Sequence, residues 1–382
     1  MTSNDVEMTL ALTQIRQRLV AVVLAIVTIC FILVHTDDAA TASQSRPVPL
    51  LLTGVTGTSL AFVVSATNVD CASRRCLQLQ RTNDNGTTFT SLHLPPISDV
   101  KGNLGNLGEI IFANSIDGYA SIVVGNSLVW YTTTDGARSW HREYVAAGES
   151  ILQLAPTHNE LYTVIAKCVK KNTCTDFRIA HSALTDNKWT IEALPKSLYK
   201  GNFALDVYNT NVWLNLQGSQ SPLLFTSTDQ GRTFSESSTS PLASVSACNL
   251  TPMSPNAVWA ECPTGMLVSF LYSSDAGAHW ISVSKYTYAG TGGGAFDPVS
   301  SSLAYLNFGT FTTRGKDLYV ITDAGHRMTA VGNLACTSAN DLVFSNAAHG
   351  LTICQTNSTA SSSTYLLRTS DGGMSWKKLT LP

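Results

Sequence analysis

An eight-residue pattern that recurs along the chain constrains the fold more than any other feature. It reads Ser or Thr, any residue, Asp, any residue, Gly, any residue, Ser or Thr, and finally Trp or Phe. Near-complete copies lie at 82–89, 133–140, 227–234, 273–280 and 369–376. The second copy has Ala137 in place of the Gly, and the fourth has His279 at the seventh place. Eroded copies at 185–189 and 322–326 fill the two gaps, so the chain is predicted to be built from repeated modules.

The spacing of the repeat indicates what each module is. The shared aspartates are Asp84, Asp135, Asp186, Asp229, Asp275, Asp323 and Asp371, separated by 43 to 51 residues. That period accommodates one four-stranded propeller blade. Short apolar runs such as 109–112 and 128–131 precede the pattern, one more follows it, and clusters of Gly, Asn, Asp and Ser separate them, which is typical of strands. We therefore predict an all-β, seven-bladed propeller of four-stranded antiparallel blades over residues 47–382.

The residue types of the pattern favour a structural role. An aspartate is short enough to accept hydrogen bonds from backbone N–H groups of its own turn, and the Gly permits a positive φ in a hairpin. The final aromatic residue provides an apolar body that we expect to hold the turn on its own blade. These aromatic residues are Phe89, Trp140, Trp189, Phe234, Trp280 and Trp376. Seven aspartates with one shared task are not seven active sites, so no catalytic residue is predicted among them.

The pattern resembles the Asp-box, or BNR, repeat family over residues 47–382. That family includes sialidases, sortilin-type receptor ectodomains, xyloglucanase-type glycosidases and propellers like the photosystem II assembly factor. The stretches 111–119 and 131–136 look most like the assembly-factor style of blade. The resemblance implies that the boxes lie on outer hairpins, away from the central channel where ligands of the family bind. It implies a propeller and leaves the activity open.

The N-terminal region predicts export of the propeller. Sixteen apolar residues, Leu19 to Val34, follow Arg16 and Arg18 and precede two aspartates. This charge order predicts a cytoplasmic N-region over 1–18 and a helix over 19–35 that is either a signal peptide or a membrane anchor. Residues 36–46 form the expected linker, in which Ala40 to Ala42 fit a cleavage site after Ala42. Both alternatives place the propeller outside the membrane, with membrane contact only through 19–35.

The cysteines agree with an exported protein. Of nine cysteines, Cys30 lies in the apolar segment, and the other eight form four close pairs: Cys71/Cys76, Cys168/Cys174, Cys248/Cys262 and Cys336/Cys354. Spacing alone does not fix how eight cysteines pair, but short loops favour the sequential pattern. A zinc site needs a Cys-x-x-Cys motif or a Cys/His cluster, and neither occurs. We predict structural disulfides, with no metal and no cofactor.

The net charge of the chain and the residues expected in the channel limit the classes of function. With 24 basic and 26 acidic residues the chain has no basic excess to neutralise phosphates, which argues against nucleic-acid binding. The first strand of each unit suggests possible channel-lining residues: Gln153, Asp206, Asn249 and Asp297. A glycosidase needs two carboxylates roughly 5 to 10 Å apart. Only Asp206 and Asp297 are acidic, and they lie two blades apart, so a hydrated channel is favoured over a catalytic one.

A sialidase interpretation has one local match. Residues 46–51 and 57–62 resemble the family's Arg-Ile-Pro segment and its next strand. Sialidases require three arginines on the substrate and have six blades, whereas Arg138 and Arg232 lie inside boxes here and the repeat predicts seven. We therefore expect a monomeric, non-catalytic recognition or scaffold module that binds a protein, peptide or glycan on a propeller face. The alternatives are a secreted glycoside hydrolase that uses channel carboxylates and a purely structural cell-surface element.

Overall fold

The structure is a computed structural model in which the Arg46–Pro382 region forms one compact unit. It describes residues 47–382 apart from segments at 72–73, 97–106, 125–126, 145–148, 171–172, 185–187, 195–201, 218–222, 238–247, 265–266, 284–287, 290–294, 308–316, 335, 337 and 358–361. The expected N-region, the apolar segment 19–35 and the cleavage site after Ala42 lie outside the described residues. No helix in the described part is long and apolar enough to cross a membrane.

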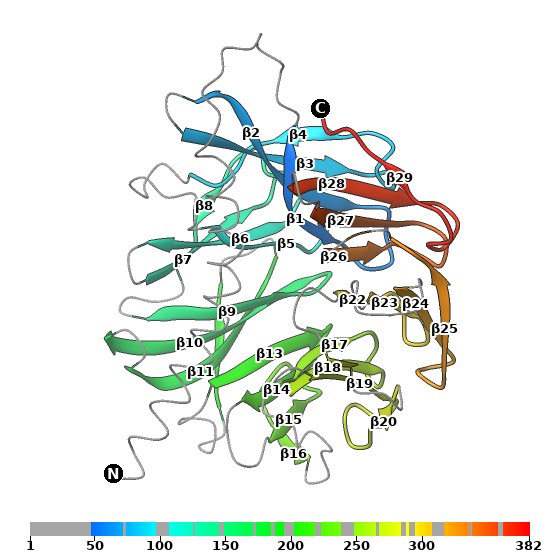
Figure 1. The fold of residues 1–382 in the computed structure, drawn as a ribbon. Coiled ribbons are helices and arrows are strands. Elements are labelled where there is room, and N and C mark those ends of the chain that lie inside the picture. Colours follow the sequence, from blue (N-terminus) through cyan, green and yellow to red (C-terminus); the bar gives the residue numbers. More distant parts are fainter. Residues whose placement is uncertain are drawn as a thin grey trace, which may run out of the picture. The chain divides into compact units, whose positions relative to one another are not determined.

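Seven antiparallel sheets make up the fold (Figure 1). Blade 1 contains β1 (Val48–Gly54), β2 (Ala61–Cys71), β3 (Arg74–Thr82) and β4 (Thr90–Leu92). Blade 2 contains β5 (Leu107–Phe112), β6 (Gly118–Val124), β7 (Ser127–Thr133) and β8 (His141–Arg142). Blade 3 contains β9 (Ser150–Pro156), β10 (Glu160–Lys170), β11 (Thr173–Ala183) and β12 (Thr190–Ala193).

The remaining four blades repeat this order. Blade 4 contains β13 (Asn202–Tyr208), β14 (Asn211–Gln217), β15 (Leu224–Ser227) and β16 (Ser235–Ser237). Blade 5 contains β17 (Asn249–Pro252), β18 (Val258–Thr264), β19 (Leu267–Ser273) and β20 (Ile281–Ser282), with the short β21 (Tyr288–Ala289) also paired to β19. Blade 6 contains β22 (Ala295–Pro298), β23 (Ala304–Asn307), β24 (Leu318–Thr322) and β25 (Arg327–Gly332). Blade 7 contains β26 (Ser338–Phe344), β27 (Gly350–Asn357), β28 (Ser362–Thr369) and β29 (Lys377–Lys378).

The predicted seven-bladed, all-β propeller is confirmed. Each blade is built from strands that follow one another in the chain, and each strand pairs with its sequence neighbours. The one addition is β21, which makes blade 5 five-stranded. Because the sheets of blades 1 and 7 contain only their own strands, no strand exchange joins them in the described structure.

Consecutive blades are joined by buried apolar clusters, and the same kind of contact joins blade 7 to blade 1. There Leu52, Ala61 and Val63 of blade 1 pack against Leu351 and Ile353 of blade 7. Two side-chain bonds accompany this packing, from Gln80 Nε2 to the Pro382 carbonyl at 3.1 Å and from Arg368 Nη1 to Thr87 Oγ1 at 2.8 Å. Apolar burial, which is non-directional, therefore closes the ring.

The inner strands are apolar on both faces because a blade covers each face. In β14, Val212, Trp213 and Leu214 are all buried. Val212 and Leu214 pack with residues of blade 3, whereas Trp213 between them packs with residues of blade 5. Successive side chains of a strand point to opposite faces. A continuous apolar run is therefore what a sheet between two neighbours requires.

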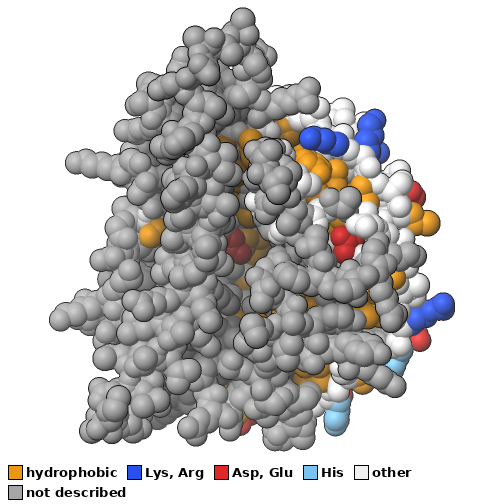
Figure 2. All heavy atoms as spheres, viewed as in Figure 1, with side chains coloured by type: hydrophobic (Ala, Val, Ile, Leu, Met, Phe, Trp, Pro, Cys, Tyr) orange, Lys and Arg blue, Asp and Glu red, His pale blue; other side chains and the backbone are white. Residues whose placement is uncertain are grey.

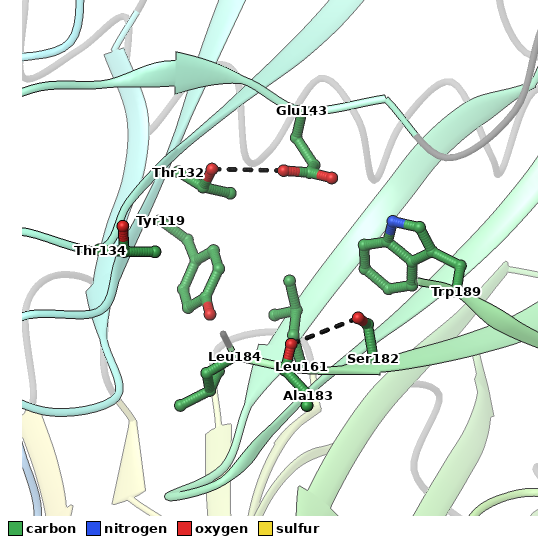
Figure 3. A pocket seen from close by; sticks show the side chains of 9 residues that line it. All are labelled: Tyr119, Thr132, Thr134, Glu143, Leu161, Ser182, Ala183, Leu184 and Trp189. Carbon is green, nitrogen blue, oxygen red and sulfur yellow. Dashed lines mark hydrogen bonds between the residues drawn. The ribbon is translucent and has the colours of Figure 1, made fainter. Parts of the chain in front are cut away.

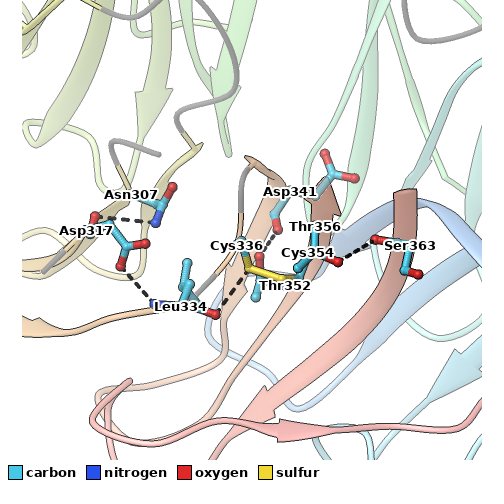
Figure 4. The surroundings of a disulfide bond; sticks show 9 residues. All are labelled: Asn307, Asp317, Leu334, Cys336, Asp341, Thr352, Cys354, Thr356 and Ser363. Atoms are coloured by element: carbon cyan, nitrogen blue, oxygen red, sulfur yellow. Dashed lines mark hydrogen bonds between the residues drawn. A yellow bond between two sulfur atoms is a disulfide. The ribbon is translucent and has the colours of Figure 1, made fainter. Parts of the chain in front are cut away.

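Three of the four predicted cysteine pairs are disulfides in the structure. Cys168–Cys174 links β10 to β11, Cys248–Cys262 links the entry of β17 to β18, and Cys336–Cys354 links the entry of β26 to β27. Figure 4 shows the last of these beside Asp341 and Thr352. The side chains of Cys71 and Cys76 lie outside the described part. The three bridges are compatible with an extracytoplasmic location.

Candidate functional site

The five near-complete boxes share one hydrogen-bonded turn. In the first, Asp84 Oδ1 accepts bonds from the backbone N–H groups of Thr87 and Thr88 at 2.9 and 2.8 Å, and Asp84 Oδ2 accepts from the Thr88 hydroxyl at 2.7 Å. The first residue of the pattern, Thr82, donates its hydroxyl to Asp84 and accepts from the Gly86 N–H at 2.8 Å. Asp135, Asp229, Asp275 and Asp371 each bond to the residue four places on and to the first residue of their box.

These bonds keep the box carboxylates ionised. Burial raises the pKa of Asp84, but the hydrogen bonds from Thr88, Thr82 and Thr87 outweigh it and bring the pKa to about 2. For Asp229 the Thr233 hydroxyl and N–H are the largest causes and lower its pKa to about 2. The pKa of Asp135 is lowered chiefly by the corresponding groups of Ser139. A carboxylate that accepts several N–H and O–H bonds holds its proton weakly.

The box aromatics contact the neighbouring blade in addition to their own, as the ring contacts of Trp140 with Phe112 and of Trp376 with Phe344 show for the own blade. Phe89, in blade 1, packs against the cluster that contains Leu351 of blade 7, and Trp280, in blade 5, packs against the cluster that contains Leu224 of blade 4. The aromatic residues of the other boxes follow the same rule: Trp140, Trp189, Phe234 and Trp376. Each aromatic residue therefore packs into the joint with the preceding blade rather than on its own blade alone. Stacked sheets expose their faces only to neighbouring blades, which gives a large apolar ring nowhere else to be buried.

Of the two eroded copies, one lies largely outside the described residues and the other differs from the complete boxes in its backbone. Asp186 is outside the described residues. Asp323 has a φ of 55° and is followed by Ala324 and Gly325, whose φ values are also positive. In the complete boxes the aspartate precedes the left-handed residues, as Asp84 precedes Asn85 and Gly86. The 322–326 turn is therefore a hairpin of a different backbone form.

The suggested channel residues lie on the innermost strands, where most of them face the next blade. Gln153 of β9 joins blades 3 and 4, because its Oε1 accepts from the Leu205 N–H at 2.9 Å and its Nε2 donates to the Leu205 carbonyl at 3.2 Å. Asp206 of β13 accepts from the Leu250 N–H of β17. Asp297 of β22 accepts a short bond from the Phe344 N–H of β26. The structure does not bring Asp206 and Asp297 together, since each serves a different joint.

Asn249 differs from the other three suggested residues. It pairs with Glu261 across β17 and β18, and its side chain hydrogen-bonds to the Glu261 carboxylate. Both groups belong to blade 5. Asn249 therefore supports its own blade rather than a joint.

Sequence reasoning missed a fourth member of the innermost set, Asp341 of β26. Its Oδ2 accepts from the Leu52 N–H of β1 at 3.0 Å, across the joint where the ring closes. The available signal was an acidic residue beside the apolar run 342–344 in a first strand. A bulge between Ala339 and Asp341 shifts the pairing of β26 with β27, so simple alternation along the strand does not indicate which face Asp341 occupies.

The innermost carboxyls are poorly solvated. Burial raises the pKa of Asp206 to about 7, that of Asp297 to about 8 and that of Asp341 to about 6, in each case against one backbone hydrogen bond. Asp206 Oδ2 is buried without a hydrogen-bond partner. One N–H donor is too few to replace the water that an ionised carboxylate loses on burial. These groups are suited to hold blades together, and they do not converge on one cavity.

A small pocket lies between blades 2 and 3 (Figure 3). Tyr119 and Glu143 come from blade 2, and Leu161, Leu184 and Trp189 come from blade 3. Thr132, Thr134, Ser182 and Ala183 complete the lining. The cavity has a volume of about 20 Å³, room for roughly one water molecule. It is therefore suited to the tip of a ligand rather than to a whole ligand.

Glu143 is the carboxyl group of this pocket, and only 9% of it is exposed. Burial raises its pKa, while the Thr132 hydroxyl, at 3.2 Å from Oε2, and the Trp189 indole act against burial. The indole nitrogen faces the carboxylate in Figure 3, although the Trp189 Nε1 makes no hydrogen bond of ordinary geometry. Burial and the charges of Asp117 and Glu143 raise the pKa of Tyr119, which keeps its hydroxyl protonated.

Figure 2 shows how charged side chains are distributed on one face of the molecule. Among its described residues, hydrophobic and uncharged side chains predominate, and Lys, Arg, Asp and Glu are scattered. In the described part of the chain no group of three or more His, Cys, Asp or Glu side chains is arranged to hold a metal ion. Among the described residues, the pocket at Glu143 and the innermost carboxyls combine burial with ionisable groups.

Comparisons with known proteins identify the fold and no closer relationship. No family model matches the chain, and no curated protein matches its sequence. The structure is similar to YCF48 bound to D1 peptide, at 15% identity and a TM-score of 0.46, over 72% of this chain and 80% of that one. It is similar to the GH74 xyloglucanase from Xanthomonas campestris, at 12% identity and a TM-score of 0.32, over 83% and 70%.

A third similar structure has the highest TM-score of the three. The β-propeller domain of the Trilobed protease from Pyrococcus furiosus, described as having an open velcro topology, matches at 9% identity and a TM-score of 0.54. The match covers 88% of this chain and 99% of that one. At such identities a likeness shows architecture only. The chain is a seven-bladed β-propeller.

Proposed function

We propose that this chain is an exported Asp-box propeller that binds a protein, peptide or glycan partner and catalyses no reaction. The observation that carries the proposal is the recess between blades 2 and 3. It holds a buried carboxylate, an indole N–H and a phenol on a scaffold whose blades are fixed to each other by apolar clusters. A rigid concave site with a few polar groups is what ligand recognition requires.

The placement of the innermost carboxyls also supports binding over hydrolysis. A glycosidase needs an acid and a base or nucleophile on opposite sides of one bond. Asp206 bonds to a strand of blade 5 and Asp297 to a strand of blade 7. Both are occupied in structural contacts of different joints, which argues against Asp206 and Asp297 as the acid and base of a hydrolase.

Export is proposed from the N-terminal sequence and the cysteines together. The apolar segment at 19–35 with its preceding arginines supports translocation of the residues after it. Three disulfides support an oxidising compartment. Whether the segment is removed or retained as an anchor does not alter the side of the membrane on which the propeller lies.

The test is binding reconstituted with purified components. The full-length protein would be crosslinked in cells at its site of residence, and any captured partner purified and titrated against it, in parallel with a glycan array. Saturable binding to one partner or glycan class is the expected result. The proposal would be wrong if no ligand binds while a panel of glycosides is cleaved and Asp206→Asn or Asp297→Asn abolishes cleavage.

A further inference from the structure

The pocket between blades 2 and 3 is lined by a buried carboxyl group, Glu143, that pairs with no basic side chain among the described residues. Glu143 is 9% exposed, and Asp117, whose charge also acts on Tyr119, is 4% exposed. Asp117 accepts one bond from Asn114 Nδ2 at 2.7 Å. In the part of the chain that the structure describes, no Lys, Arg or His side chain forms an ion pair with either carboxylate. A buried carboxyl group in the pocket wall, with a second acidic group acting on the adjacent Tyr119, favours a cationic guest.

The walls of the pocket fit one kind of cation. Tyr119 and Trp189 offer aromatic rings, which attract cations at their faces, and Leu161 and Leu184 offer apolar surface (Figure 3). The Thr132 hydroxyl and the Trp189 N–H both face Glu143 and favour its ionised form. The site thus combines an acceptor for a positive charge with a surface for an aliphatic chain.

We propose that this pocket takes a primary ammonium group, the tip of a lysine side chain on a partner protein, with its aliphatic stem against Leu161 and Leu184. The inference rests on the proposed binding function and names the chemistry that the function would recognise. The lysine stem buries its methylene groups while the ammonium meets Glu143, as long basic side chains do on apolar surfaces.

Size discriminates between the two basic side chains. The cavity of about 20 Å³ has room for a group as large as one water molecule, and an ammonium is of that size. A guanidinium is a planar fork of four heavy atoms that needs a wider slot and several acceptors. An anion is disfavoured because the Glu143 carboxylate lines the pocket. The pocket should therefore select ammonium over guanidinium and over a neutral hydroxyl.

The experiment is a titration of the full-length protein with three small probes of equal length: n-butylammonium, n-butylguanidinium and n-butanol, at matched ionic strength. The readout is the indole N–H signal of Trp189 in a nitrogen-15 correlation spectrum, assigned as the signal that Trp189→Phe removes. We expect saturable shifts with n-butylammonium at a Kd on the order of 10 mM, and binding at least about tenfold weaker for the other two probes. The three probes are compared on the unaltered protein, and Trp189→Phe serves only to assign the signal.

A matched pair of variants locates the charge. Glu143→Gln keeps the shape and should weaken n-butylammonium about tenfold or more, whereas Glu236→Gln, at an exposed position of β16, should leave it unchanged. Equal shifts from the alcohol and the amine, or no shift from any probe, would overturn the ammonium site. A partner captured by crosslinking would then still support the binding function. Selective ammonium binding without any partner would contradict the function alone.

Discussion

Aspartates at the rim of the propeller and aspartates on its innermost strands have opposite acidities. In the box turns, Asp84 and Asp229 each collect several N–H and O–H donors, and their pKa falls to about 2. On the innermost strands, Asp206, Asp297 and Asp341 each meet one backbone N–H, and their pKa rises to between about 6 and about 8. The same side chain is thus an ionised cap in one region and a group that resists ionisation in the other.

The difference shows that the ionisation of an aspartate depends on two quantities: the number of hydrogen-bond donors to its carboxylate and the hydration that the carboxylate loses on burial. A half-exposed turn provides donors and keeps some hydration, so the charge is stable. A joint between two blades removes hydration and offers only the N–H groups that are not already paired within their own sheets. The inner aspartates therefore tie blades together at a cost that increases when they ionise.

The largest expected effect tests the packing of a rim hairpin. Gly373 has a φ of 88°, and a Cβ there would lie 2.2 Å from Leu318 of blade 6, so Gly373→Ala should lower the free energy of unfolding by about 3 kcal/mol. Gly57 has a similar φ of 73° with nothing within 4 Å of a Cβ, so Gly57→Ala should cost about 1 kcal/mol through backbone strain only. Urea unfolding measures both. Equal losses would show that the hairpin is not pressed against the preceding blade.

The next effect is the dependence of stability on pH, in which the two regions have opposite signs. Box aspartates have a lowered pKa when folded, so their contribution is present above about pH 4 and is lost as the pH falls toward 2. The inner aspartates have a raised pKa, so their contribution is complete below about pH 4 and is lost as the pH rises toward 8. We expect the free energy of unfolding to have its maximum near pH 4 to 5 and to fall from there to pH 8.

Urea unfolding at pH 3, 5 and 8 checks this profile. The triple variant Asp206→Asn, Asp297→Asn, Asp341→Asn should flatten the limb between pH 5 and 8 and leave the acid limb in place. Stability that keeps rising from pH 5 to 8 would contradict the raised pKa values of the inner groups.

A smaller effect on stability is expected when the same change, Asp to Asn, is made at a box aspartate and at an inner aspartate. Asp84→Asn removes a charged acceptor from the box and should cost about 1 kcal/mol at pH 8, since water competes for this half-exposed turn. Asp297→Asn keeps an acceptor for the Phe344 N–H and removes a buried charge, so it should be neutral or stabilising by about 1 kcal/mol at pH 8. Thermal unfolding at pH 8 distinguishes the signs. Destabilisation of similar size at both sites would erase the distinction between rim and inner aspartates.

The smallest effect concerns the box that departs from the pattern. His279 stands where other boxes have Ser or Thr, and its Nδ1 lies 2.6 Å from Asp275 Oδ2 at an exposed position. His279→Thr restores a hydroxyl to the same acceptor, so the free energy of unfolding should change by less than about 0.5 kcal/mol. His279→Ala, which leaves no side-chain donor, is the control and should be less stable than His279→Thr. A large loss on the threonine change would mean that this box depends on the imidazole.

Much of the fold could be predicted because the residues of the repeat interact with one another over short distances in the chain. The Asp, the Gly and the hydroxyl residues of 369–376 interact within eight residues, so their pattern survives in the sequence and its period counts the blades. The sequential cysteine pairs followed from the same locality. The candidate pocket did not, because Glu143 and Trp189 lie on different blades and neither belongs to a recognisable motif.

The inner strands show why a register could not be chosen from sequence. A strand between two blades is apolar on both faces, so it lacks the alternation of polar and apolar residues that would show which face each side chain occupies. In β26, the bulge at 339–341 also shifts the pairing with β27. Asp206 and Asp297 could be found as acidic residues in such strands. Their partners, Leu250 and Phe344, could not, because those contacts span about 45 residues and depend on how one blade sits on the next.

The sequence by itself determined the number of blades and the form of the box hairpins, and it favoured the three cysteine pairs that the structure joins, because each of these depends on residues close together in the chain. The tertiary structure decided which neighbouring blade each box aromatic packs against, which aspartates ionise easily, and where a buried carboxyl group lines a recess. Those outcomes depend on burial and on donors from another blade, and neither exists until the blades are assembled.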